Sequence, residues 1–154
     1  METVLITKQE KNYSSFIHLS LFTKYFFPFG NYIFPAILWG TKKNESAFID
    51  YNGKQAINFQ LSILLYSITA LVIAVPTFLV TLLSNFSWSE IENGNIIIND
   101  SNFMHLTGLG IFGAICCALV VLLKIAEFFY IIYAAIKSSN GEKVKYPLTI
   151  NFIK

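Results

Sequence analysis

The sequence predicts an all-α integral membrane protein with three hydrophobic segments. Of its 154 residues, 55% are hydrophobic and only 13% are charged. Soluble domains usually carry about 25% charged residues, so this chain is short of the side chains that cover a water-facing globule. The apolar residues also gather in long runs rather than being scattered. We expect two of these runs to form long transmembrane helices.

The first hydrophobic segment, residues 16–39, contains Pro28, Gly30 and Pro35. Each proline removes a backbone donor and crowds the preceding helical turn, so we expect a helix to break near Phe29. Two arrangements fit this Pro/Gly-broken segment. The preferred one is a single kinked span, and the alternative is an interfacial helix followed by a re-entrant half-helix whose broken backbone is covered by protein.

The second and third segments run over residues 57–83 and 103–136, and the second contains Pro76. Crossing a bilayer takes about 20 apolar residues, so both segments are long enough to span it. The chain therefore divides into a polar N-terminal tail at 1–15, a membrane helical domain at 16–139 and an amphipathic C-terminal tail at 140–154.

The C-terminal tail has an apolar residue at every second position. These residues are Val144, Tyr146, Leu148, Ile150 and Phe152. An extended chain with this period presents one apolar face, which we expect to lie against the membrane surface or the helix ends. The Asn140-Gly141 pair just before it is a typical helix stop.

Topology follows from the lysines. The loop after the first segment and the C-terminal tail hold Lys42, Lys43, Lys54, Lys137, Lys143, Lys145 and Lys154. The loop at residues 84–102 holds only acidic charges. Because lysine-rich loops stay inside, we expect a multi-pass protein of the bacterial inner (cytoplasmic) membrane with a cytoplasmic C-terminus. Lys8 and Lys11 leave the side of the N-terminus open.

The stretch Gly108–Gly113, written GLGIFG, matches the dinucleotide fingerprint G-x-G-x-x-G. That fingerprint needs a strand directly before it and a helix packed on a sheet after it, whereas here the polar residues 99–102 precede it and no second βα unit exists. Small residues four apart instead predict a helix-packing face. Its members are Gly110, Gly113, Ala114, Cys117 and Ala118.

Four polar residues of the second and third segments form a candidate polar cluster. Lys124 and Glu127 lie three apart, so they share a helix face and can pair. Asn58 and Gln60 reach a similar depth, and we expect one of them to hydrogen-bond to that pair. The structural interpretation is a lysine that extends to the interface beside a paired carboxylate. The functional interpretation is that these charges serve an activity, because a charge inside a bilayer is costly and is usually kept for a function.

Several classes of function lack support in the sequence. All eleven basic residues are lysine and the net charge is +2, which gives no footprint for nucleic acid. Cys116 and Cys117 are adjacent, where a disulfide is strained, and no Cys/His cluster has metal-ligand spacing. No nucleophile–base spacing is visible either. We therefore expect no enzymatic activity and no cofactor.

Five runs of the sequence together resemble a known family. They are Phe29–Trp39 (FGNYIFPAILW), Ser46–Asp50 (SAFID), Ala56–Gln60 (AINFQ), Ala134–Lys137 (AAIK) and Asn140–Pro147 (NGEKVKYP). In this order they resemble a widespread Tic-like bacterial membrane family that includes the magnetosome proteins MamF and MmsF. The resemblance covers nearly the whole chain and implies a small protein with three or four spans, without implying an activity.

Two functions follow as expectations. The leading one is a non-enzymatic scaffold or accessory subunit that packs with itself or with another membrane protein in the lipid bilayer, through the small-residue face. The alternative is a channel or small carrier whose path is lined by the polar cluster at the cytoplasmic side of the helices.

Overall fold

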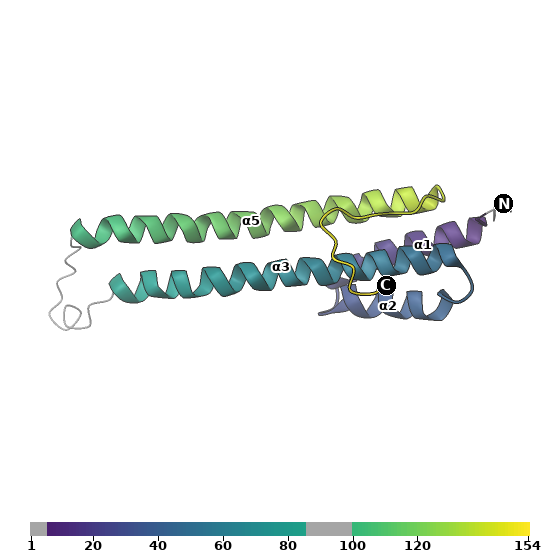
Figure 1. The fold of residues 1–154 in the computed structure, drawn as a ribbon, viewed down its shortest axis with the longest axis horizontal. Coiled ribbons are helices and arrows are strands. Elements are labelled where there is room, and N and C mark those ends of the chain that lie inside the picture. The colour runs from purple at the N-terminus through teal and green to yellow at the C-terminus, as the bar shows by residue number, and fades with distance from the viewer. Residues whose placement is uncertain (1–5, 86–99) are drawn as a thin grey trace. The chain divides into compact units, whose positions relative to one another are not determined.

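The fold was analysed in a computed structural model that describes residues 6–85 and 100–154, with side chains described at 6–80 and 110–154. Over these residues every regular element is helical (Figure 1). The elements are α1 (Lys8–Leu19), the 3₁₀ helix η1 (Ser20–Tyr25), α2 (Gly30–Lys42), α3 (Ala47–Asn85) and α5 (Asp100–Ser139). Most of the predicted acidic loop at 84–102 lies outside the described residues.

The chain forms two compact units. Unit 1 comprises Met1–Leu65 and Ile125–Lys154, and unit 2 comprises Tyr66–Lys124. Unit 1 holds the hydrophobic core, to which the N-terminal helices, α3, α5 and the C-terminal tail all contribute. The core residues are Ile17, Leu21, Ile49, Ala56, Phe59, Ile63, Ile131, Ala134, Val144 and Tyr146.

Two helices are long and apolar enough to cross a membrane. The qualifying stretches are Ala47–Val80 in α3 and Gly110–Ser139 in α5, which confirms the two long helices expected from the sequence. α3 has 39 residues and α5 has 40. At about 1.5 Å per residue each helix is about 60 Å long, roughly twice the hydrocarbon thickness of a bilayer. A part of each helix is therefore left over for packing outside the hydrocarbon.

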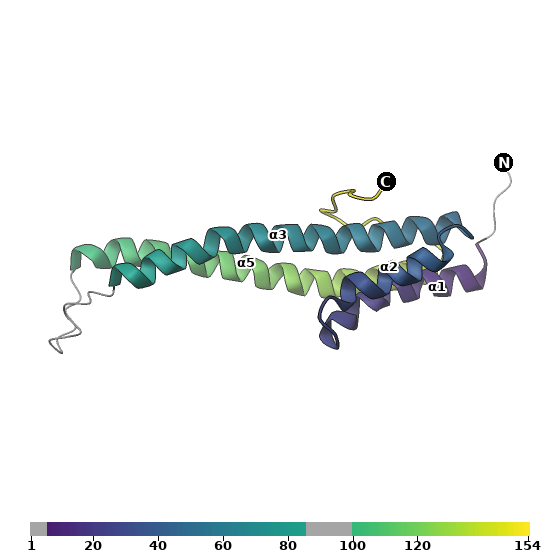
Figure 2. The same cartoon turned by 90° about the horizontal axis from the view of Figure 1, so that it is seen from below.

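The first hydrophobic segment is a helical hairpin, so the preferred expectation of one kinked span is wrong. Tyr13 Oη donates a hydrogen bond of 2.9 Å to the carbonyl of Leu38, which puts the middle of α1 beside the last turns of α2. Figures 1 and 2 show the two helices running in opposite directions. α2 has 13 residues, or about 20 Å, which is too short to cross a bilayer.

The reversal occurs between the end of η1 and the start of α2. Phe29 precedes α2 in the left-handed conformation, with φ 62°. Pro28 lies in the same turn, where its fixed φ and its missing N–H are tolerated. Gly30 then starts α2 so close to η1 that a Cβ would lie 2.8 Å from the carbonyl oxygen of Thr23. Pro35 sits inside α2 without ending it.

Local capping explains where α1 begins and where α5 ends. The Thr7 hydroxyl accepts from the amide of Glu10, and the Glu10 carboxylate accepts from the amide of Thr7, which is a capping box. At the other end, Gly141 has φ 87° and its amide donates to the carbonyl of Ser138. The amide of Glu142 donates to the carbonyl of Lys137, which completes a Schellman motif. The Asn140-Gly141 stop predicted for this helix is confirmed.

Helices α2 and α3 approach closely at Gly53. A Cβ added there would lie 2.3 Å from Cδ1 of Trp39 and 2.8 Å from its Cβ. Atoms so near the backbone of Trp39 cannot move aside cheaply. Trp39 is also held by its indole N–H, which donates to Asp50 at 2.9 Å. The absence of a side chain at Gly53 is therefore a packing requirement.

We expect Gly53→Ala to destabilise the protein by about 1–3 kcal/mol, the usual effect of forcing a group into a packed site. Gly40→Ala is the matched control, because a Cβ at Gly40 meets no described atom within 4 Å. That change in an exposed helix should be neutral or stabilise by up to about 1 kcal/mol. Thermal unfolding of both variants in detergent tests this, and equal Tm values for the two would contradict the packing argument.

Candidate functional site

A buried ion pair in unit 1 joins α5 to the N-terminal hairpin. Glu127 on α5 has a fully buried side chain, and its Oε1 lies 2.5 Å from the ammonium of Lys24 on η1. Gln60 on α3 donates to the same oxygen at 2.9 Å. The Gln60 carbonyl oxygen in turn accepts from Asn31 on α2 at 2.7 Å. One carboxylate thus links side chains from four different elements.

The energetics of this cluster make its members interdependent. Withdrawing a carboxylate and an ammonium from water costs several kcal/mol each, and their attraction offsets this only when geometry and hydrogen bonding are good. The side chain of Lys24 is 16% exposed, against none for Glu127. Such a pair adds little net stability compared with apolar residues, but loss of one partner removes an opposite charge from a buried group and is strongly destabilising.

The structure brings together only part of the predicted polar cluster. The hydrogen bond between Gln60 and Glu127 is one of the two contacts expected. Asn58 instead binds the backbone of Ile153 in the C-terminal tail. Lys124 lies in unit 2 with an exposed side chain, and its pairing with Glu127 stays a prediction.

Sequence reasoning missed Lys24 and Asn31 as members of this cluster. Lys24 had a usable signal, because a single lysine in an apolar segment needs a carboxylate nearby. Asn31 had none, since its position beside Gln60 depends on the reversal of the chain at the hairpin.

A second buried network centres on His18 of α1. Its Nδ1 lies 2.8 Å from the hydroxyl of Tyr146, and its Nε2 lies 3.4 Å from Oδ1 of Asn52. Burial lowers the pKa of His18 to about 4. The ring is therefore neutral at pH 7, with Nε2–H donating to Asn52 and Nδ1 accepting from the tyrosine hydroxyl. Burial, together with the charge of Glu127, also raises the pKa of Tyr146, so that hydroxyl stays a donor.

The C-terminal tail is attached to α3 by side chains that replace a partner strand. Asn52 Oδ1 accepts from the amide of Val144 at 3.2 Å. Ser62 Oγ accepts from the amide of Ile150 at 2.9 Å. Asn58 binds both backbone groups of Ile153, at 2.9 and 3.0 Å. Figure 1 shows the tail crossing from α5 to α3.

The predicted alternation of the tail holds only over its first part. Val144 and Tyr146 are buried in the core, as one apolar face requires. Leu148 then adopts φ 55°, which turns the chain. Beyond it Ile150 and Phe152 are exposed, so the second part of the tail presents its apolar side chains outward.

The GLGIFG stretch lies inside the continuous helix α5, so it is not a phosphate-binding loop. In unit 2 the predicted packing face is open. A Cβ added at Gly110 or Gly113 meets no described atom within 4 Å. The other three members of this face are Ala114, Cys117 and Ala118, and all are exposed.

Comparison with known proteins identifies a family. The family model described as the magnetosome magnetite crystal formation protein family, MamF/MmsF, matches residues 9–153. This match supports the MamF and MmsF part of the resemblance and does not support the Tic-like label. No curated protein and no solved structure matches the chain. Among the described residues, no group of three or more His, Cys, Asp or Glu side chains is placed to hold a metal ion.

We expect Lys24→Met to lower the free energy of unfolding by about 3–5 kcal/mol, because it leaves the carboxylate of Glu127 buried without Lys24. Adding Glu127→Gln to Lys24→Met should recover most of that loss, since both charges are then gone. Lys8→Met, at an exposed position, is the matched control. Unfolding in detergent measures all three variants, and a Lys24→Met protein as stable as the control would refute the role of the ion pair.

The low pKa of His18 predicts a pH dependence. The folded protein holds His18 neutral down to pH about 4, whereas an unfolded chain protonates it near 6.5. Between these values the unfolded state binds more protons, so stability present above pH 6.5 is lost as the pH falls towards 4. Relative to His18→Gln, the wild type should lose up to about 3 kcal/mol over this range. Unfolding measured from pH 7.5 to 4 tests this, and a constant difference between the proteins would contradict it.

Proposed function

The chain belongs to the magnetosome magnetite crystal formation protein family, MamF/MmsF, and on this premise we propose that it is a non-enzymatic scaffold or accessory subunit of a membrane assembly. Its two apolar helices fit a small membrane protein. Its setting is the bacterial inner membrane, crossed by α3 and α5 with the lysine-rich C-terminal tail on the cytoplasmic side.

The observation that carries the proposal is the open small-residue face of α5. Helices in a bilayer gain no hydrophobic drive to associate, so they associate through small residues that let two backbones approach closely. Here a Cβ added at Gly110 or Gly113 would meet no described atom within 4 Å, and Ala114 and Ala118 are exposed. A helix from a second copy or from another membrane protein would fill this face.

The polar cluster supports a structural role over a conducting path. Asn31 donates to Gln60, Gln60 donates to Glu127, and Lys24 pairs with the same carboxylate. A pathway for ions needs sites that bind weakly enough to release them. Groups that are buried and already paired within the chain are better suited to holding helices in register.

We expect Gly110→Leu and Ala114→Leu to weaken self-association about tenfold each, which corresponds to about 1.4 kcal/mol, by keeping a second helix away. Neither change should disturb the fold, because both positions are open in the described chain. Leu119→Phe is the matched control, since it adds bulk at an exposed position on the opposite side of α5. Energy transfer between labelled copies in liposomes measures association.

An oligomer distribution that is the same for all three variants would count against the scaffold proposal. Ion or solute flux through proteoliposomes would instead favour the channel or carrier alternative. That interpretation requires Glu127→Gln to abolish flux while the protein still reaches the membrane in normal amounts.

A further inference from the structure

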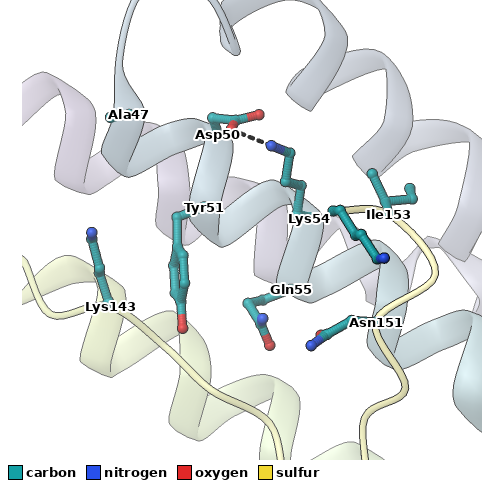
Figure 3. Close-up of a pocket in the computed structure, with 9 residues that line it drawn as sticks. Ala47, Asp50, Tyr51, Lys54, Gln55, Lys143, Asn151 and Ile153 are labelled. Carbon is teal, nitrogen blue, oxygen red and sulfur yellow. Dashed lines mark ion pairs between the residues drawn. The ribbon is translucent and has the colours of Figure 1, made fainter.

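A cavity of about 360 Å³ lies in unit 1 between the first turns of α3 and the C-terminal tail. It is separate from the buried ion pair and from the small-residue face of α5. Figure 3 shows the polar side chains that both segments contribute to the cavity, with Gln55 and Asn151 on one side of Tyr51 and Lys143 on the other. Its lining residues are Ala47, Asp50, Tyr51, Lys54, Gln55, Lys143, Asn151, Ile153 and Lys154.

The charges around this cavity are unbalanced. Three lysines and one aspartate line it. The aspartate, Asp50, is already engaged, because Lys54 lies 2.6 Å from one of its oxygens and Trp39 donates to the other at 2.9 Å. The ammonium of Lys143 lies 5.2 Å from the ring centre of Tyr51, and no described carboxylate pairs with Lys143 or Lys154. Two lysine side chains at the cavity, Lys143 and Lys154, are therefore without a paired side-chain carboxylate among the described residues.

A buried hydrogen-bonding group faces the same space. Gln55 Oε1 is buried and has no hydrogen-bond partner among the described residues. Figure 3 places the Gln55 side chain between Tyr51 and Asn151 in the cavity. An amide offers an acceptor at one end and two donors at the other, so either orientation leaves a group that needs a polar partner. A buried polar group without one is costly, which favours a ligand or water here.

The tail also brings apolar surface to this end of the molecule. Ile153 lines the cavity, and Ile150 and Phe152 earlier in the same segment are exposed, with 40% and 49% of their surface accessible. A basic cavity on a tail that also exposes apolar side chains suits a ligand with an anionic head and an apolar part. Basic pockets at the cytoplasmic end of membrane helices are suited to anionic lipid headgroups.

We propose that this cavity binds a phosphate ester anion through Lys143 and Lys154, with Gln55 contacting its hydroxyl or phosphate oxygens. The ester is either the headgroup of an anionic lipid or a soluble phosphate ester. The site does not depend on the small-residue face of α5, so it stands or falls separately from the scaffold role.

The test is a titration of the full chain in detergent micelles, followed by native mass spectrometry. Phosphatidylglycerol and phosphatidylcholine form the lipid arm, and glycerol 3-phosphate forms the soluble arm. We expect phosphatidylglycerol to bind more tightly than phosphatidylcholine. Lys143→Gln should weaken its binding about fivefold, the effect of one lysine beside an anionic headgroup, and adding Lys154→Gln should weaken it further.

Lys145→Gln is the matched control, because it removes the same charge two residues away at an exposed position that does not line the cavity. It should change binding less than twofold. Lipid binding that depends on Lys143 supports a headgroup site, and glycerol 3-phosphate binding with the same dependence supports a soluble ester. Equal losses in Lys143→Gln and Lys145→Gln would show diffuse attraction and overturn the proposal. So would the lack of any preference for an anion.

Discussion

The packing of unit 1 depends on the need to neutralise one buried carboxylate. Glu127 lies on a helix that is otherwise apolar over most of its length, and its side chain is fully buried. Lys24 supplies a cation, which reaches the carboxylate because the first hydrophobic segment folds back as a hairpin. Gln60 and Asn31 then tie α3 and α2 to the same charge. The arrangement of four elements thus follows from one desolvated group that must be paired.

The C-terminal tail shows a second constraint of the same kind. It is an extended segment without a neighbouring strand, so its amides need other partners. Side chains of α3 supply them at Asn52, Asn58 and Ser62. Asn52 also accepts from His18, and Tyr146 stacks on Phe59 with ring centres 4.1 Å apart. By holding the tail on α3, these contacts place Lys143 and Asn151 around the proposed phosphate site.

The two units differ in which side chains they bury. Unit 1 buries asparagine, glutamine, histidine and glutamate side chains and satisfies most of them internally. Unit 2 consists of helical segments whose described apolar side chains are largely exposed. Exposed apolar surface of this extent marks contact with lipid or with other proteins. The small-residue face of α5, the buried ion pair and the basic cavity therefore differ in chemistry and lie on different residues of the same short chain.

Sequence by itself determined the elements whose causes are local. Composition and apolar run length predicted the two long helices, and the Asn140-Gly141 stop of α5 followed from glycine's access to positive φ. Tertiary structure alone decided which polar groups meet. Similar depth in the membrane made Asn58 and Gln60 equal candidates for the contact with Glu127, because depth does not tell in which direction around the helix axis a residue points. Packing decided for Gln60. Pro28 and Gly30 predicted a break near Phe29, but the reversal of the chain there depends on Phe29 adopting a left-handed conformation, which a phenylalanine does not favour by itself. The positions of Lys24 and Asn31 follow from that reversal and the basic cavity follows from the docked tail, so long-range packing decided them.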